Sequence, residues 1–123
     1  MRLYHYTSAE IKDKIKVKHY GVNSYSDNDV KATNIKRSFW YSKPIIAECH
    51  LKDSKYYYIA NVTKGSIYNL KTDRLKLKSR HNTISALLKN IKRRGYKGIL
   101  YYLGYDIVNL FYDVEYNKRK ILC

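Results

Sequence analysis

The sequence predicts an α+β fold, with a mainly antiparallel or mixed β-sheet and short helices. Short runs of aromatic and β-branched residues recur along the chain, as is typical of strands. One later segment, residues 82–94, has the apolar periodicity of a helix. The expected order is a strand, a helix and then strands interrupted by helices, which favours this fold class over regular β-α alternation. The length of 123 residues fits one compact domain over 1–123.

The first expected element is a short strand over Arg2–Tyr6. Thr7 and Glu10 then form a T-x-x-E pattern, a capping box that marks the start of a helix. Ile11 and Ile15 would give that helix a narrow apolar stripe. We therefore expect a helix directly after the first strand, ending near residue 18.

The segment His19–Lys36 is polar and rich in Asn, Asp and Ser, which predicts a long loop. A long loop in a small domain is often functional. A short aromatic strand over Ser38–Tyr41 follows it. Pro44 suits the first turn of a helix, so we expect a short helix over Ile45–Leu51.

The second half of the chain contains the clearest helix, Asn82–Arg94, in which apolar residues recur at helical spacing. Gly95 is a natural residue to follow its end. Four strands are expected around this helix, the last two joined by a turn at Gly104. They cover Tyr56–Val62, Ser66–Leu70, Tyr96–Tyr102 and Asp106–Tyr112.

The charge balance points to an acidic partner. The chain has 25 Lys and Arg against 10 Asp and Glu, a formal net charge of +15, which attracts polyanions whatever the fold. We expect the partner to be nucleic acid or another acidic macromolecule, and the sequence leaves the oligomeric state open. The basic residues expected to contact it are Lys36, Arg37, Lys92, Arg93 and Arg94, with the Lys118–Lys120 group contributing less.

Other classes of protein fit the sequence poorly. No apolar run approaches the roughly 20 residues that span a bilayer, and the N-terminus lacks the apolar region of a secretory signal. Cys49 and Cys123 form no disulfide framework, so we expect a cytoplasmic protein without membrane association. No metal is expected, because the sequence has neither C-x-x-C nor H-x-x-x-H. The glycine patterns of phosphate-binding loops are absent as well.

His5 is the first candidate for a functional side chain. It lies beside the hydroxyl residues Thr7 and Ser8 at the expected helix start, where free N–H groups suit a ribose or phosphate. The alternative is that His5 is an ordinary core histidine and that Thr7 only caps a helix.

Six segments in sequence order together resemble the motifs of the ADP-ribosyltransferase superfamily, in its small phage or bacterial His-Tyr-acid form. The resemblance implies a split β-sheet that binds NAD, as co-substrate, in a cleft. It covers most of the chain, and the order of the motifs carries it. The segments are Leu3–Ser8, Ser38–Ser42, Tyr57–Val62, Ile67–Leu70, Arg94–Ile99 and Gly104–Phe111.

The first two motifs imply the residues that bind NAD. His5 would hydrogen-bond the nicotinamide ribose, with support from Thr7 or Ser8. Tyr41 or Trp40 would stack on the nicotinamide ring and hold the leaving group in position. At the next position of the first motif, Tyr6 replaces the usual Gly, whose backbone contacts the nicotinamide amide.

The last motif implies that Asp106 is the catalytic acid, in place of the more common Glu. Cleavage of the nicotinamide–ribose bond develops positive charge on the ribose, which a carboxylate stabilises while it activates the acceptor. Asp113 and Glu115 are the alternative acids. The implied catalytic set is thus His5, Tyr41 and Asp106.

Two classes of function follow from these observations. The first is NAD-dependent ADP-ribosyl transfer to a nucleic acid or to a protein bound to one. The RNA 2′-phosphotransferase branch of the superfamily begins with a similar His motif, but its members are longer. The second class is a non-catalytic basic module that stacks bases on its 15 tyrosines, or an inhibitor of a defence factor.

Overall fold

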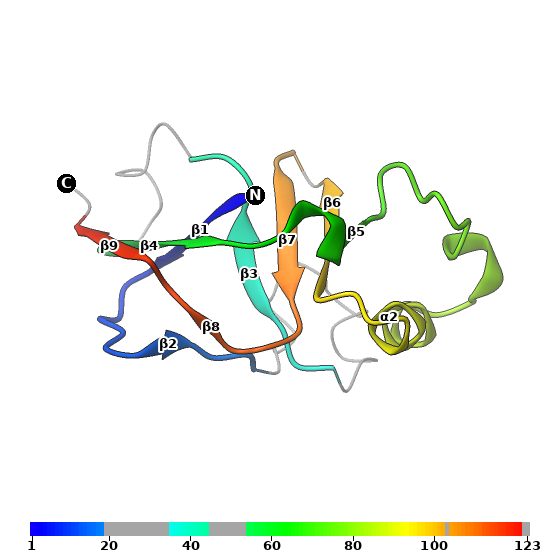
Figure 1. Cartoon of the computed structure of the whole chain (residues 1–123), viewed down its shortest axis with the longest axis horizontal. Coiled ribbons are helices and arrows are strands. Elements are labelled where there is room, and N and C mark those ends of the chain that lie inside the picture. The colour runs from blue at the N-terminus through cyan, green and yellow to red at the C-terminus, as the bar shows by residue number, and fades with distance from the viewer. Residues whose placement is uncertain (19–34, 45–53, 103, 122–123) are drawn as a thin grey trace.

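The computed structural model describes residues 1–18, 35–44, 54–102 and 104–121. They form a mostly β structure with a seven-stranded sheet in the order β5-β6-β7-β3-β1-β4-β9 and a two-stranded sheet of β2 and β8 (Figure 1). The strands are β1 (Arg2–Thr7), β2 (Lys14–Ile15), β3 (Ser38–Tyr41), β4 (Tyr56–Asn61), β5 (Ile67–Asn69), β6 (Gly98–Tyr102), β7 (Asp106–Leu110), β8 (Val114–Glu115) and β9 (Lys118–Ile121). The helices are α2 (Ile84–Arg93) and the 3₁₀ turns η2 (Lys64–Ser66) and η3 (Lys78–Arg80).

The large sheet is mixed, as the sequence predicted. All its neighbouring strands pair antiparallel except β5 and β6, which run parallel. Parallel neighbours need a crossover connection, and α2 supplies it between these two strands. The α+β class is confirmed in this form: a mixed sheet with one described α-helix.

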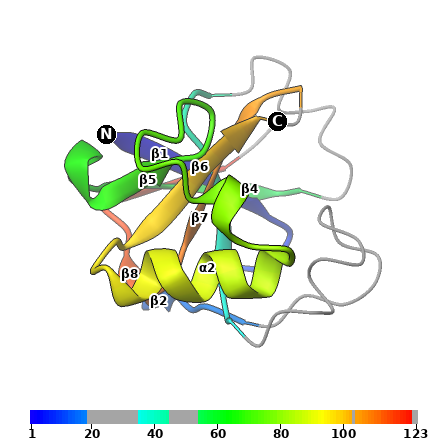
Figure 2. The same ribbon diagram turned by 90° about the vertical axis from the view of Figure 1, so that its right-hand side faces the viewer.

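The two faces of the sheet have different covers. On one face, Leu3, Trp40 and Val108 form a core with Ile15 and Val114 of the small sheet, and we call this the β8 face. On the other, the α2 face, Ile99 and Tyr101 pack under the helix, which lies in front of β6 and β7 in Figure 2. Because successive residues of a strand point to opposite faces, every strand of the sheet has side chains on both faces.

The helix predicted after the first strand is wrong. Thr7 is the last residue of β1, its hydroxyl accepts a hydrogen bond from the N–H of Ala9 at 3.1 Å, and Ile15 lies buried in β2. Tertiary contacts replace the capping box, because a short helix with a narrow apolar stripe has little stability of its own.

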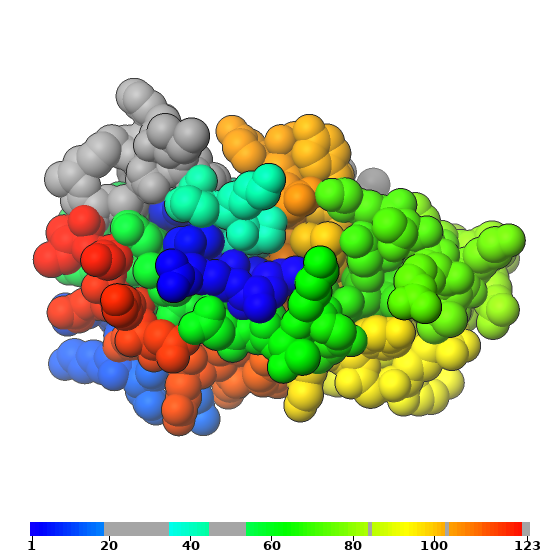
Figure 3. Space-filling model, turned by 45° about the horizontal axis from the view of Figure 1, so that its top comes forward, coloured from blue at the N-terminus to red at the C-terminus, as the bar shows by residue number. Residues whose placement is uncertain are grey.

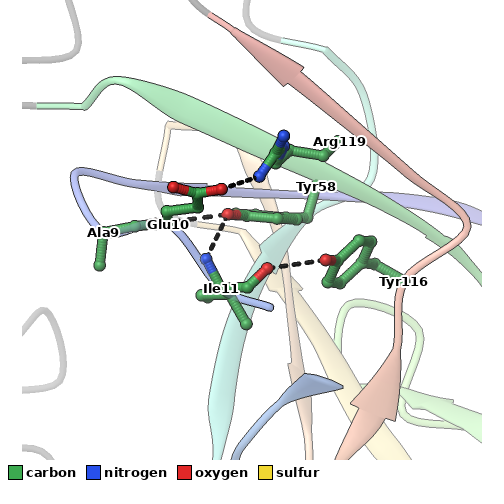
Figure 4. A network of polar contacts seen from close by, with 6 residues as sticks. All are labelled: Ala9, Glu10, Ile11, Tyr58, Tyr116 and Arg119. Atoms are coloured by element: carbon green, nitrogen blue, oxygen red, sulfur yellow. Dashed lines mark hydrogen bonds and ion pairs between the residues drawn. The ribbon is translucent and has the colours of Figure 1, made fainter. Parts of the chain in front are cut away.

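Figure 4 shows the side chains that hold this segment in its irregular conformation. The hydroxyl of Tyr58 accepts a hydrogen bond from the N–H of Ile11 at 2.6 Å, and the hydroxyl of Tyr116 donates to the Ile11 carbonyl at 2.7 Å. Glu10, expected to complete the capping box, forms an ion pair with Arg119 of β9 instead. Side chains of β4 and of the connection between β8 and β9 therefore satisfy polar groups that a helix would have bonded internally.

The other expected elements are confirmed where the structure describes them. β3 coincides with the predicted aromatic strand, and the four strands of the second half appear with shorter bounds. Thr83 caps α2 by accepting a hydrogen bond from the N–H of Ala86, and Gly95 follows the helix with a φ of 95°. Residues 19–34 of the predicted loop and the predicted helix over Ile45–Leu51 lie outside the described residues. The sequence prediction missed β8 and β9, which are short and, in β9, mostly charged.

The close approach of β6 to β7 makes a testable demand on Gly98. An added β-carbon there would lie 2.1 Å from the carbonyl oxygen of Asn109, so Gly98→Ala must push the two strands apart. We expect a loss of at least about 1–3 kcal/mol of stability, visible as a lower melting temperature in a calorimetric or circular-dichroism scan. Gly65→Ala is the control, since nothing lies within 4 Å of its added carbon. Equal melting temperatures for the two variants would contradict this packing.

Candidate functional site

His5 is a residue of β1, and its side chain is held by the neighbouring strand β3. Its Nδ1 is 2.7 Å from the carbonyl oxygen of Phe39 on β3, and the centroid of its ring lies 5.2 Å from that of the Trp40 ring. A carbonyl oxygen only accepts, so Nδ1 carries the proton and donates. Near this bond, β1 pairs with β3 at a single described position, Tyr4 opposite Tyr41. The His5 side chain thus adds a link along the short β1–β3 seam.

The chemistry of the imidazole follows from this environment. Burial is the main cause that lowers the pKa of His5 below its ordinary value, with Lys18 adding to the effect, while the Phe39 hydrogen bond partly opposes it. The neutral ring with its proton on Nδ1 has an acceptor lone pair on Nε2. No hydrogen bond to Nε2 joins it to the described residues. A ligand hydroxyl is the kind of group that this nitrogen would bind.

The other members of the first motif do not form the expected anion site. Thr7 ends β1 and Ser8 follows it in a bend, so no helix N-terminus is available there for a phosphate. Trp40 is 0% exposed, and its indole N–H donates to the hydroxyl of Ser38 at 2.7 Å. A ring so enclosed has no face open to a nicotinamide, which leaves Tyr41 as the stacking candidate.

Tyr41 belongs to a group of tyrosines on the α2 face of the sheet. Its ring centroid lies 5.6 Å from that of Tyr6 and 6.0 Å from that of Tyr105. The Tyr6 ring stacks on that of Tyr57, with 5.4 Å between the centroids. His5 and Trp40, their neighbours in sequence, point to the β8 face. The structure therefore brings Tyr6 and Tyr41 together but separates both from His5 by the thickness of the sheet.

Asp106 begins β7 and lies on the β8 face, since it alternates with the core residue Val108. Its carboxylate forms an ion pair with Lys71 at 2.9 Å, and both side chains are partly exposed. The strand of Asp106 neighbours β3, and β3 neighbours β1, so the three strands that carry the motifs lie side by side.

The two alternative acids lie elsewhere. Asp113 follows β7 and accepts a hydrogen bond from the N–H of Val17 at 2.9 Å. Glu115 lies exposed on β8, opposite Lys14 of the small sheet. Asp106 is thus the acid that shares the large sheet with His5.

The basic residues predicted to bind nucleic acid are not equivalent. Lys36, Lys92, Arg93 and Arg94 are exposed, the last three at the end of α2. Arg37 is only 3% exposed, and its guanidinium donates to the side-chain carbonyl of Asn109 at 2.7 Å. Alternation along the chain places this arginine in the interior, which does not favour the predicted contact of Arg37 with a polyanion.

The described residues form neither a metal-binding cluster nor a membrane-spanning helix. No group of three or more His, Cys, Asp or Glu side chains in this part of the chain is arranged to hold a metal ion. No helix among these residues has the length and apolar character needed to cross a membrane.

Comparison with protein-family models, with curated proteins and with solved structures finds no match to the chain.

The half-buried His5 predicts a specific pH dependence of stability. Because its pKa is lowered in the folded state, the unfolded chain binds the proton more readily. Stability is therefore retained above the unfolded pKa of about 6.5 and falls as the pH drops below it. His5→Asn keeps an amide N–H where Nδ1 stands but does not titrate, so its melting temperature is expected to fall less between about pH 7.5 and 5. Parallel melting curves across this range would show that His5 does not contribute.

Proposed function

We propose that this protein is an NAD-dependent ADP-ribosyltransferase that acts on a nucleic acid or on a protein bound to one. The observation that carries the proposal is the adjacency of β1, β3 and β7, the strands that bear the histidine, aromatic and acidic motifs. These segments are far apart in the sequence, and only the sheet brings them together. The resemblance to the superfamily's motif order supports the same function.

His5 would bind the substrate rather than move a proton. Its neutral ring offers Nε2 as an acceptor, and the Phe39 carbonyl fixes the orientation of the ring. A sugar hydroxyl donates well to such an acceptor, which fits the ribose role that the resemblance implies. The same hydrogen bond holds the ring before any ligand arrives, so little conformational entropy is lost on binding.

Asp106 would supply the negative charge. A carboxylate near the ribose stabilises positive charge that develops as the bond to nicotinamide breaks, and it can accept the proton of the acceptor. In the structure, the Nζ of Lys71 lies 2.9 Å from Oδ1 of Asp106 and neutralises this carboxylate. The proposal therefore requires Lys71 to move aside or to bind a phosphate of the substrate.

The stacking role in this proposal falls to Tyr41, because Trp40 is enclosed in the core. Tyr41 and His5 lie on opposite faces, so one dinucleotide can contact both only at the seam between β1 and β3. That seam has one described residue pair, whereas β1 and β4 are joined by six. The sparse pairing favours this seam as the place where a dinucleotide would approach both side chains while the hydrogen bond from His5 to Phe39 is kept.

The first test of the proposal is NAD binding. Asparagine reproduces the Nδ1 donor of His5, and glutamine reproduces the acceptor position of Nε2. We expect calorimetry to show NAD binding to the wild type, a loss of at least about tenfold in His5→Asn, and a smaller loss in His5→Gln. His81→Asn is the control, since the His81 side chain contacts Asn90 of α2, away from the proposed site. An absence of NAD binding at millimolar concentration would remove the basis for the enzyme.

The second test removes the charge of the acid and keeps its shape. In Asp106→Asn, NAD should still bind, while transfer of labelled ADP-ribose falls at least about tenfold, which corresponds to about 1.4 kcal/mol on the barrier. Loss of the partly exposed Lys71 pair should change stability little. Glu115→Gln, on the small sheet, is the matched control. Unchanged transfer in Asp106→Asn would assign the acid to another residue.

A further inference from the structure

Three adjacent strands, β1, β4 and β9, contain no acidic residue and form one half of the α2 face. We call their surface on this face the tyrosine face. It carries three half-buried rings and four exposed basic side chains, assigned to it by strand alternation and register, with Lys55 directly before the first residue of β4. Its residues are Arg2, Tyr4, Tyr6, Lys55, Tyr57, Lys118 and Lys120.

The rings of this surface form a continuous group. The ring centroid of Tyr57 lies 5.4 Å from that of Tyr6, with 28° between the ring planes. It lies 6.4 Å from the ring centroid of Tyr4. Through Tyr6 the group continues to Tyr41 on β3. Among the described residues, the apolar cluster under α2 includes no member of β1, β4 or β9. The helix thus covers the other half of the sheet and leaves these rings out of its core.

The basic residues are sorted between the two faces. On β9, Arg119 points to the β8 face and pairs with Glu10, whereas Lys118 and Lys120 lie on the tyrosine face opposite Ile59 and Tyr57. Both ion pairs among the described residues involve residues of the β8 side, Arg119–Glu10 and Lys71–Asp106. Figure 3 shows blue atoms of the first strand and red atoms of the last on one side of the molecule. The positive charge next to the rings is therefore not neutralised by acids of the same strands.

We propose that the tyrosine face binds single-stranded nucleic acid. Unpaired bases stack on half-exposed aromatic rings, and phosphates are attracted by the surrounding lysine and arginine side chains. A duplex keeps its bases stacked inside, so rings on a sheet surface add nothing to its binding. As the acceptor of ADP-ribose, this single strand rests on the proposed function, but its binding does not require NAD.

The test measures binding of fluorescent 12-nucleotide DNA and RNA single strands, and of the matching DNA duplex, by anisotropy over a salt series without NAD. We expect the single strands to bind more tightly than the duplex. Tyr57→Leu should weaken single-strand binding about five- to hundredfold, while Tyr57→Phe keeps the ring and most of the affinity. A comparison of DNA with RNA shows which strand is preferred.

A charge-matched pair of variants locates the surface. Lys118→Ala with Lys120→Ala removes two charges from the tyrosine face, and Lys92→Ala with Arg93→Ala removes two from the end of α2. The first should lower affinity and reduce the slope of log affinity against log salt by about 1–2, and the second should have a smaller effect. Equal losses in both pairs, tighter binding of the duplex, or full affinity of Tyr57→Leu would overturn the proposal. Because NAD binding is measured separately, failure of one proposal leaves the other intact.

Discussion

β1 is an interior strand of the large sheet, between β3 and β4, and the rest of the structure depends on its pairing. Six residue pairs join it to β4. One residue pair and the hydrogen bond from His5 to Phe39 join it to β3. Its alternating residues then separate two environments. Leu3 points into the core of the β8 face, whereas Tyr4 and Tyr6 belong to the aromatic group on the other face. This strand therefore also separates the two proposed binding surfaces.

Much of the fold could be predicted from local pattern. Aromatic and β-branched runs became β3 and β4, and helical spacing became α2, because in these segments local preference and tertiary packing agree. The segment after Thr7 shows the opposite case. Its capping-box pattern was overridden by hydrogen bonds from Tyr58 and Tyr116, which lie 47 and 105 positions away from Ile11. No local rule contains partners at such distances.

The candidate site was less predictable, because exposure depends on register. The sequence offered His5 and Asp106 as candidates, but it did not show that Lys71 pairs with the Asp106 carboxylate or that Trp40 is enclosed. Arg37 looked like a surface charge beside Lys36, yet it bonds to Asn109 inside the sheet. The tyrosine face could have been anticipated in part: alternation along Arg2–Thr7 places Tyr4 and Tyr6 on one side, and only the pairing with β4 adds Tyr57.

β9 is the outermost strand of the sheet, and all four of its residues are exposed. An open strand edge is a template for pairing with a second copy of the chain, and lysine and arginine side chains oppose such pairing by repulsion. Three of the four residues of β9 are basic, so like charges would oppose the pairing of this edge with the β9 edge of a second molecule. A bound polyanion would neutralise this repulsion. Molecules gathered along one strand of nucleic acid would then lose their main protection against edge-to-edge assembly.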